Sequence, residues 1–181
     1  MASHSSFAEL VSVMARLRAP DGCPWDREQT HQSLKPFLLE EAYEVLEAID
    51  EAEDGELCSE LGDVLLQVVF HAQVAVEGGR FTIDDVCQAI VDKLIRRHPH
   101  VFGNIDVASS DEVVENWEAI KKRERQSETG PAPSALDGVP RQLPALLRAQ
   151  RVQDKARRAG FDWQQIDGPL EKVTEEFEEL R

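Results

Sequence analysis

The chain has 181 residues, 41% of them hydrophobic, and it carries a formal net charge of −15. A chain of this length can bury one good hydrophobic core. Its charge excludes long polyanions, because binding to a nucleic-acid backbone depends on lysine and arginine side chains. We therefore expect no nucleic-acid polymer as partner, whereas a small phosphate ligand that arrives with a metal ion remains compatible with the charge.

Signals for secretion and membrane insertion are missing from the sequence. Residues 1–6 contain neither a basic segment nor an apolar one, and no apolar run approaches the roughly 18 residues of a membrane span. The cysteines, Cys23, Cys58 and Cys87, are odd in number and form no CxxC pair, which is typical of reduced thiols. The sequence thus predicts a cytoplasmic protein that does not cross a membrane.

The first strongly periodic segment, residues 33–54, predicts an amphipathic helix. At about 100° per residue, its apolar side chains gather on one side, which we expect to face the core. Its acidic side chains gather on the other side, and Glu41 falls on the border between the two. The apolar set is Leu34, Leu38, Ala42, Val45, Leu46 and Ile49, and the acidic set is Glu40, Glu44, Glu47 and Glu51.

The next segment, residues 56–76, predicts a helix that is apolar around nearly its whole circumference. This pattern is typical of a helix buried in a bundle. Its polar side chains form one narrow stripe: Glu56, Glu60, Asp63, Gln67 and His71. A short connection that contains Gly55 favours antiparallel packing of the two helices.

Both helices belong to a stretch of 44 residues, 36–79, that holds 12 acidic residues and no lysine or arginine. His71 is the one candidate counter-ion. Carboxylates that gather without a cation raise one another's pKa, and burying them unpaired costs several kcal/mol.

In an antiparallel pair, Glu41 and Glu44 can face Glu60 and Asp63. Four carboxylates of this kind suit Mg²⁺, or Mn²⁺ as a substitute. A solvated acidic surface is the alternative for the other glutamates.

Two later helices carry basic residues. A helix over residues 82–98 opens with a capping box, Thr82 with Asp85. Near its end, one face carries Lys93, Arg96 and Arg97. These cations either complement the C-terminal end of the helix dipole or bind phosphate oxygens. A helix from residue 109 has a second capping box and carries Trp117 and Lys121 one turn apart, so Trp117 is either a core side chain or a platform for a base.

Four motifs in chain order resemble the MazG family of nucleoside triphosphate pyrophosphohydrolases. They are CPWDREQT at residues 23–30, EExxE at 40–44, ExxD at 60–63 and KLIRRHPHVF at 93–102. EExxE alone is common on surface helices, whereas the ordered set is specific. The resemblance implies an all-α antiparallel helical bundle of the all-α NTP pyrophosphohydrolase type, completed by homodimerisation. It also implies Mg²⁺-dependent hydrolysis of a nucleoside triphosphate to the monophosphate and pyrophosphate, as house-cleaning of the nucleotide pool.

The resemblance also implies a role for each matching residue. The metal ligands are Glu41, Glu44, Glu60 and Asp63, and Glu40 either lies outside the ligand set or orients water. Lys93, Arg96, Arg97 and Lys121 contact phosphates, and Trp117 contacts the nucleoside. One departure concerns Glu56, because some copies of this domain have lysine at that position, one turn before the ExxD glutamate. With glutamate instead of lysine at this position, the chain lacks a cation that would favour triphosphate binding.

We expect three segments along the chain. Residues 1–126 form the MazG-like domain, residues 127–163 a linker with a short helix, and residues 164–181 the opening helix of a second, truncated repeat. The last expectation depends on residues 175–179, EEFEE, which repeat the EExxE spacing. An ordinary acidic helix is the alternative for this end of the chain.

Two rival functions remain open from the sequence. A catalytically weak domain for dimerisation or partner binding would have a similar composition. A superfamily relative with a narrow substrate, such as dUTP or phosphoribosyl-ATP, is the other, although the motifs at 23–30 and 93–102 favour the MazG-like interpretation. No Walker GxxxxGK[ST] loop occurs, and base and sugar preference are not determined by the sequence.

Overall fold

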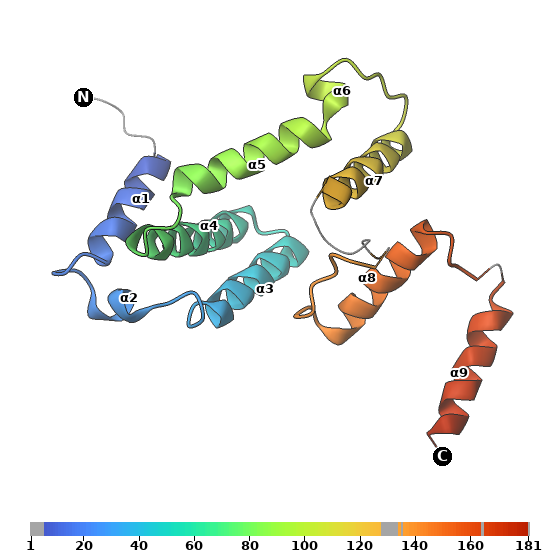
Figure 1. The fold of residues 1–181 in the computed structure, drawn as a ribbon. Coiled ribbons are helices and arrows are strands. Elements are labelled where there is room, and N and C mark those ends of the chain that lie inside the picture. The colour runs from blue at the N-terminus through green and yellow to red at the C-terminus, as the bar shows by residue number, and fades with distance from the viewer. Residues whose placement is uncertain (1–5, 128–133, 135, 164, 181) are drawn as a thin grey trace. The chain divides into compact units, whose positions relative to one another are not determined.

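The computed structural model describes residues 6–127, 134, 136–163 and 165–180, and these residues form helices and connections without a strand. The all-α prediction is confirmed (Figure 1). The helices are α1 (Ser6–Leu17), α2 (Pro24–Glu28), α3 (Lys35–Glu51), α4 (Asp54–Glu77), α5 (Ile83–Arg97), α6 (Pro99–Phe102), α7 (Ser110–Ser127), α8 (Ala145–Arg158) and α9 (Asp167–Glu179). None of them is both long and apolar enough to span a membrane.

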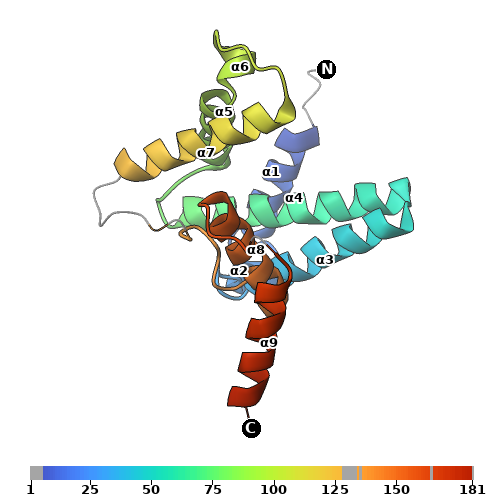
Figure 2. The ribbon, with the colours of Figure 1, turned by 90° about the vertical axis from the view of Figure 1, so that its right-hand side faces the viewer.

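The chain divides into two compact units, Met1–Asp106 and Val107–Arg181. In the first unit, α3 and α4 run side by side as an antiparallel helical hairpin (Figures 1 and 2). Their turn is tighter than the predicted connection, because Gly55 lies inside α4 and Ala52 makes the turn with φ 57°. Alanine in this left-handed region is strained, and glycine is the residue usually found there.

The hydrophobic core lies where α1 packs against the C-terminal half of α4. Met14 of α1 and Leu34, just before α3, meet Val69 and Phe70 of α4, and all four side chains are buried. Phe37 in the first turn of α3 packs against this cluster. The core therefore joins the start of α3 to the end of α4 and leaves the other end of the hairpin outside it.

The predicted burial of the α3 and α4 apolar faces is wrong for much of their surface. On α3 the exposed apolar side chains include Leu38, Leu46 and Ile49, and on α4 they include Leu61, Leu65 and Val68. The side of α3 that turns toward α4 instead carries Phe37, Glu41 and the buried Ala48. A helix apolar on most sides therefore keeps exposed apolar surface, because α1 covers only part of α4.

Arg18, directly after α1, connects three segments of the first unit. Its Nε and Nη2 donate to the Glu77 carboxylate at 2.8 and 2.6 Å, and its Nη1 donates to the carbonyls of Asp26 and Gln29. The guanidinium carbon also lies 5.5 Å from the centroid of the Phe70 ring. The side chain is only 6% exposed, so these contacts satisfy a cation that the fold has removed from water.

The Arg18–Glu77 pair makes stability depend on pH. Hydrogen bonding to Arg18 lowers the pKa of Glu77 below its ordinary 4.5, partial burial opposes this, and a hydrogen bond from Gln73 adds to it. Because the folded pKa is depressed, the pair stabilises the fold above about pH 4.5, and this contribution is lost as the pH falls through the folded pKa.

We therefore expect Glu77→Gln to lower the free energy of unfolding at pH 7 by on the order of 1 kcal/mol, an estimate discounted for solvent at this partly exposed carboxylate. The variant should also lose less stability than the unchanged chain between pH 7 and pH 3. Urea unfolding across this range measures both effects, with Glu28→Gln on exposed α2 as the control. Equal pH slopes in the two variants would contradict the role of the pair.

Two predicted helix starts are confirmed. In α5, Thr82 and Asp85 form the capping box in both directions. Before α7, Ser109 Oγ accepts from the Glu112 backbone N–H at 3.3 Å. After α8, Ala159 caps the helix and Gly160 follows with φ 85°, a left-handed conformation that favours glycine.

In the second unit, an ion pair at 3.4 Å joins Glu118 of α7 to Arg158 of α8. Residues 175–179 lie on α9, and both a truncated repeat and an ordinary acidic helix agree with this. In the predicted linker, residues 128–133 and 135 lie outside the described residues. The domain boundaries at 126 and 163 stay predictions.

Candidate functional site

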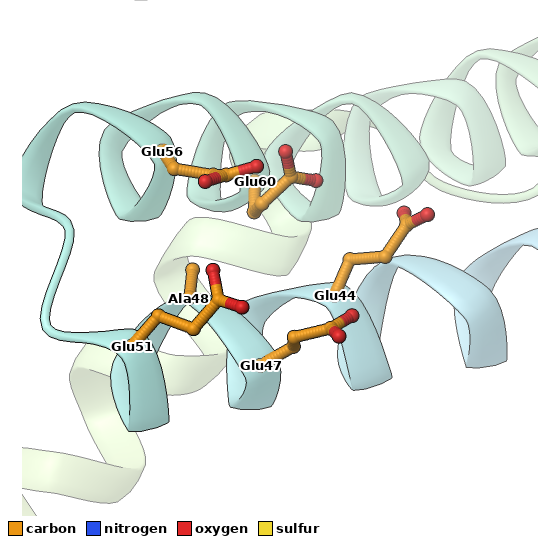
Figure 3. A pocket seen from close by; sticks show the side chains of 6 residues that line it. All are labelled: Glu44, Glu47, Ala48, Glu51, Glu56 and Glu60. Atoms are coloured by element: carbon orange, nitrogen blue, oxygen red, sulfur yellow. The ribbon is translucent and has the colours of Figure 1, made fainter.

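Acidic side chains from both helices of the hairpin line a cavity of about 280 Å³. Its lining residues are Glu44, Glu47, Ala48 and Glu51 of α3 and Glu56 and Glu60 of α4 (Figure 3). The buried Ala48 allows the helices to approach, since its side chain is small. The acidic side of α3 therefore borders a cleft shared with α4. Glu47 and Glu51 are exposed there, so a solvated acidic surface remains the alternative for them.

Three of the four predicted metal ligands come together beside this cavity. One carboxylate oxygen from each of Glu41, Glu60 and Asp63 lies within 4.8 Å of the other two, and all three residues are partly buried. We call these residues the acid triad. The fourth predicted ligand, Glu44, is exposed and lines the cavity next to the triad.

The acid triad is held together against electrostatic repulsion. Partial burial, and then the charges of Asp63 and Glu44, raise the pKa of Glu41 above its ordinary 4.5. Desolvation, then Glu44, Asp63 and Glu56, raise the pKa of Glu60 in the same way. Among the described residues, the causes of these shifts include no lysine, arginine or histidine. Such a set favours a bound cation, which would lower both pKa values.

His71 does not serve as the counter-ion. Its Nδ1 lies 2.8 Å from Nδ1 of His31, and the two rings stack at a centroid distance of 5.1 Å. Arg80 lies 2.6 Å from Nε2 of His31 on the other side of that ring. Desolvation, and then the proximity of His31, lower the pKa of His71. The histidine therefore favours its neutral form and pairs with another histidine rather than with a carboxylate.

Gln67 is a site residue to which the sequence pattern alone assigned no role. It belongs to the polar stripe of α4, one turn after Asp63, and its side chain is only 5% exposed. It donates a hydrogen bond to Glu41, an interaction that lowers the pKa of that carboxyl. Its Oε1 is buried without a hydrogen-bond partner. A hydrated divalent cation fits these groups, because carboxylate oxygens and water are its preferred ligands and the unpaired Oε1 can accept from water.

The remaining predicted residues lie outside the acid triad. Glu40 is exposed on α3; Lys93 and Arg96 are exposed and Arg97 is half-buried on α5; Trp117 and Lys121 are half-buried on α7 of the second unit. α5 contacts α4 near its own start and then diverges from it (Figure 1). Lys121 forms an ion pair with Glu118 at 3.0 Å. The substrate roles of these side chains stay predictions.

Removing one charge from the acid triad should stabilise the metal-free protein. We expect Asp63→Asn to raise the free energy of unfolding at pH 7 in EDTA by on the order of 1 kcal/mol, the size of a close charge repulsion near water. Asp50→Asn, an exposed position on α3 that does not line the cavity, is the matched control for the same charge change. Chemical unfolding measures both variants, and a clear loss of stability in Asp63→Asn would contradict the repulsion.

Comparison with known proteins places the hairpin in a family. The model of the MazG nucleotide pyrophosphohydrolase domain matches residues 29–102, which include α3, α4 and α5. A Thermotoga maritima protein named nucleoside triphosphate pyrophosphohydrolase/pyrophosphatase MazG is 51% identical over 97% of this chain. The chain belongs to the MazG family. An Escherichia coli K12 protein named nucleoside triphosphate pyrophosphohydrolase is also 51% identical, over 94% of this chain.

The MazG relatives are longer than this chain, which covers 66% of the Thermotoga maritima protein and 65% of the Escherichia coli one. A solved structure, the crystal structure of a mazG-related protein from Thermotoga maritima, is similar with a TM-score of 0.54 at 27% identity. That likeness covers 63% of this chain and 97% of the solved one. The residues that the MazG family model matches, 29–102, include the acid triad.

Proposed function

We propose that this chain hydrolyses nucleoside triphosphates to nucleoside monophosphate and pyrophosphate, as house-cleaning of the nucleotide pool, with Mg²⁺ as the metal. The observation that carries the proposal is the acid triad, in which the raised pKa values of Glu41 and Glu60 have no basic side chain among their causes. The names of the 51% identical relatives support the reaction class. The cytoplasm is the proposed compartment, and the free thiols of Cys23, Cys58 and Cys87 support it.

Glu41, Glu60 and Asp63 would hold the cation, with Glu44 as the fourth ligand from the rim of the cavity. When bound, a divalent cation neutralises phosphate oxygens and lowers the pKa of a water molecule at the site. The carboxylates themselves repel a triphosphate. The site therefore favours substrate binding only after a bound cation neutralises their charge. This requirement links substrate binding to metal binding.

The basic residues of α5 and α7 complete the proposal. Lys93, Arg96, Arg97 and Lys121 would bind the phosphates and stabilise the departing pyrophosphate, Trp117 would stack on the base, and Glu40 would orient water. One observation supports a second candidate, a catalytically weak domain for dimerisation. Glu56 lines the cavity and raises the pKa of Glu60, so it adds negative charge where triphosphate must approach.

The bond that breaks distinguishes these functions. In ¹⁸O-labelled water with Mg²⁺, we expect the label in the nucleoside monophosphate, because water attacks the α-phosphorus and pyrophosphate leaves as one unit. Mass spectrometry of the products across a panel of nucleoside triphosphates measures this. Asp63→Asn should lower kcat by at least about 100-fold, since it removes a proposed metal ligand.

Asp50→Asn is again the control and should retain activity. Label in orthophosphate, with a nucleoside diphosphate as product, would contradict the proposal. Absence of product with every nucleotide would favour the dimerisation domain, and Glu56→Lys is then the variant that tests whether the extra negative charge is the cause.

We also propose that the chain forms a homodimer through the exposed apolar surface of the hairpin. The exposed side chains of α3 include Leu39, Tyr43 and Leu46, and those of α4 include Leu61 and Leu65. Large side chains gathered on adjacent helices are typical of an interface rather than of free surface. A second copy would supply the same apolar chemistry, because a two-fold dimer pairs one surface with itself.

A charge on this surface should separate the copies. We expect Leu46→Glu to weaken the dimer at least tenfold, which corresponds to about 1.4 kcal/mol, because glutamate must lose water at an apolar interface. Sedimentation velocity over a concentration series measures the dissociation constant. Val101→Glu on exposed α6 is the control. A monomeric unchanged chain at high micromolar concentration would contradict the dimer.

A further inference from the structure

Gln67 is a polar residue that the fold buries, with 5% exposure. It lies on α4 between Asp63, one turn before it, and His71, one turn after it. Its amide donates a hydrogen bond to Glu41, whereas its Oε1 is buried and has no partner. An unpaired buried carbonyl is unfavourable, because it has lost its hydrogen bonds to water and has gained no other hydrogen bond.

The neighbours of Gln67 determine which way its amide points. Glu41, Glu60 and Asp63 are carboxylates, which accept hydrogen bonds and, when ionised, donate none. Nε2 therefore faces Glu41, because Oε1 in the same place would meet a carboxylate oxygen. No side chain of the acid triad can then donate to Oε1. The missing donor must belong to a molecule that enters the site.

We propose that Gln67 is a positioning residue of the metal centre: Nε2 orients Glu41, and Oε1 accepts a hydrogen bond from a water molecule that the divalent cation binds. The inference rests on the proposed function. Mg²⁺ keeps several of its waters when proteins bind it. A cation also polarises its water into a stronger hydrogen-bond donor. Removing a partner of this kind typically weakens metal affinity by about 10–100-fold.

Calorimetric titration of the metal-free full chain with Mn²⁺ tests this role. Gln67→Met keeps a similar volume without donor or acceptor, and we expect it to weaken Mn²⁺ binding by about tenfold. The metal-free variant should be at least as stable as the unchanged chain, because an unpaired buried oxygen is gone. Gln67→Glu keeps an acceptor oxygen and loses the donor to Glu41, so it should bind Mn²⁺ at least as tightly as the unchanged chain.

Gln73→Met is the matched control on the same helix. Gln73 donates to Glu77 at 3.1 Å, outside the acid triad, so its replacement should leave Mn²⁺ affinity unchanged. Chemical unfolding of each metal-free variant accompanies the titration, because a packing role for Gln67 would lower stability and Mn²⁺ affinity together. That joint loss in Gln67→Met would overturn the proposal.

The titration also separates this inference from the metal centre on which it rests. Equal Mn²⁺ affinity in Gln67→Met and the unchanged chain would overturn the role of Gln67 and leave the metal centre in place. A loss in Gln67→Glu as large as in Gln67→Met would overturn the role of Oε1, because loss of the hydrogen bond to Glu41 alone would explain both. Absence of Mn²⁺ binding by the unchanged chain would overturn the metal centre itself and this role with it.

Discussion

Repulsion between the carboxylates of α3 and α4 is the constraint that organises the first unit. Glu41, Glu60 and Asp63 share one small volume, and Glu44 and Glu56 add charge at its edge. Two helices that repel each other in this region need another source of attraction. The structure supplies it at the opposite end of the hairpin, where α1 packs on α4 and the ion pair of the Arg18 side chain lies.

The two ends of the hairpin therefore have different chemistry. At one end, apolar contacts and a buried guanidinium hold the start of α3 to the end of α4. At the other end, the left-handed Ala52 turn keeps the acidic segments close, although their charges oppose it. Function and stability are thus separated along one pair of helices.

Part of this organisation could be predicted from residue spacing. The helices α3, α4, α5 and α7, the antiparallel pairing of α3 with α4, and the meeting of Glu41 with Glu60 and Asp63 follow from periodicity and charge. No pattern predicted α1, which supplies part of the core. The outward direction of Leu46 and Ile49 could not be predicted, since apolar periodicity does not tell a core from an interface with another copy.

The role of Arg18 was equally hidden. A single arginine in a connection has no pattern, and its contact with Glu77 spans 59 positions. Gln67 gave a partial signal through its place in the polar stripe. Its unpaired oxygen, however, is a property of the packed side chains.

The arrangement of α3 has a consequence for how this helix can change. One side packs on α4, a second borders the acidic cleft and a third carries exposed apolar residues such as Leu46. Such a helix has little neutral surface on which substitutions can accumulate. A single inserted residue would rotate the rest of the helix by about 100°. Each side of that part would then face surroundings that do not suit its side chains. Substitutions within one side can be tolerated, but insertions and deletions in α3 between Phe37 and Ala48 cannot.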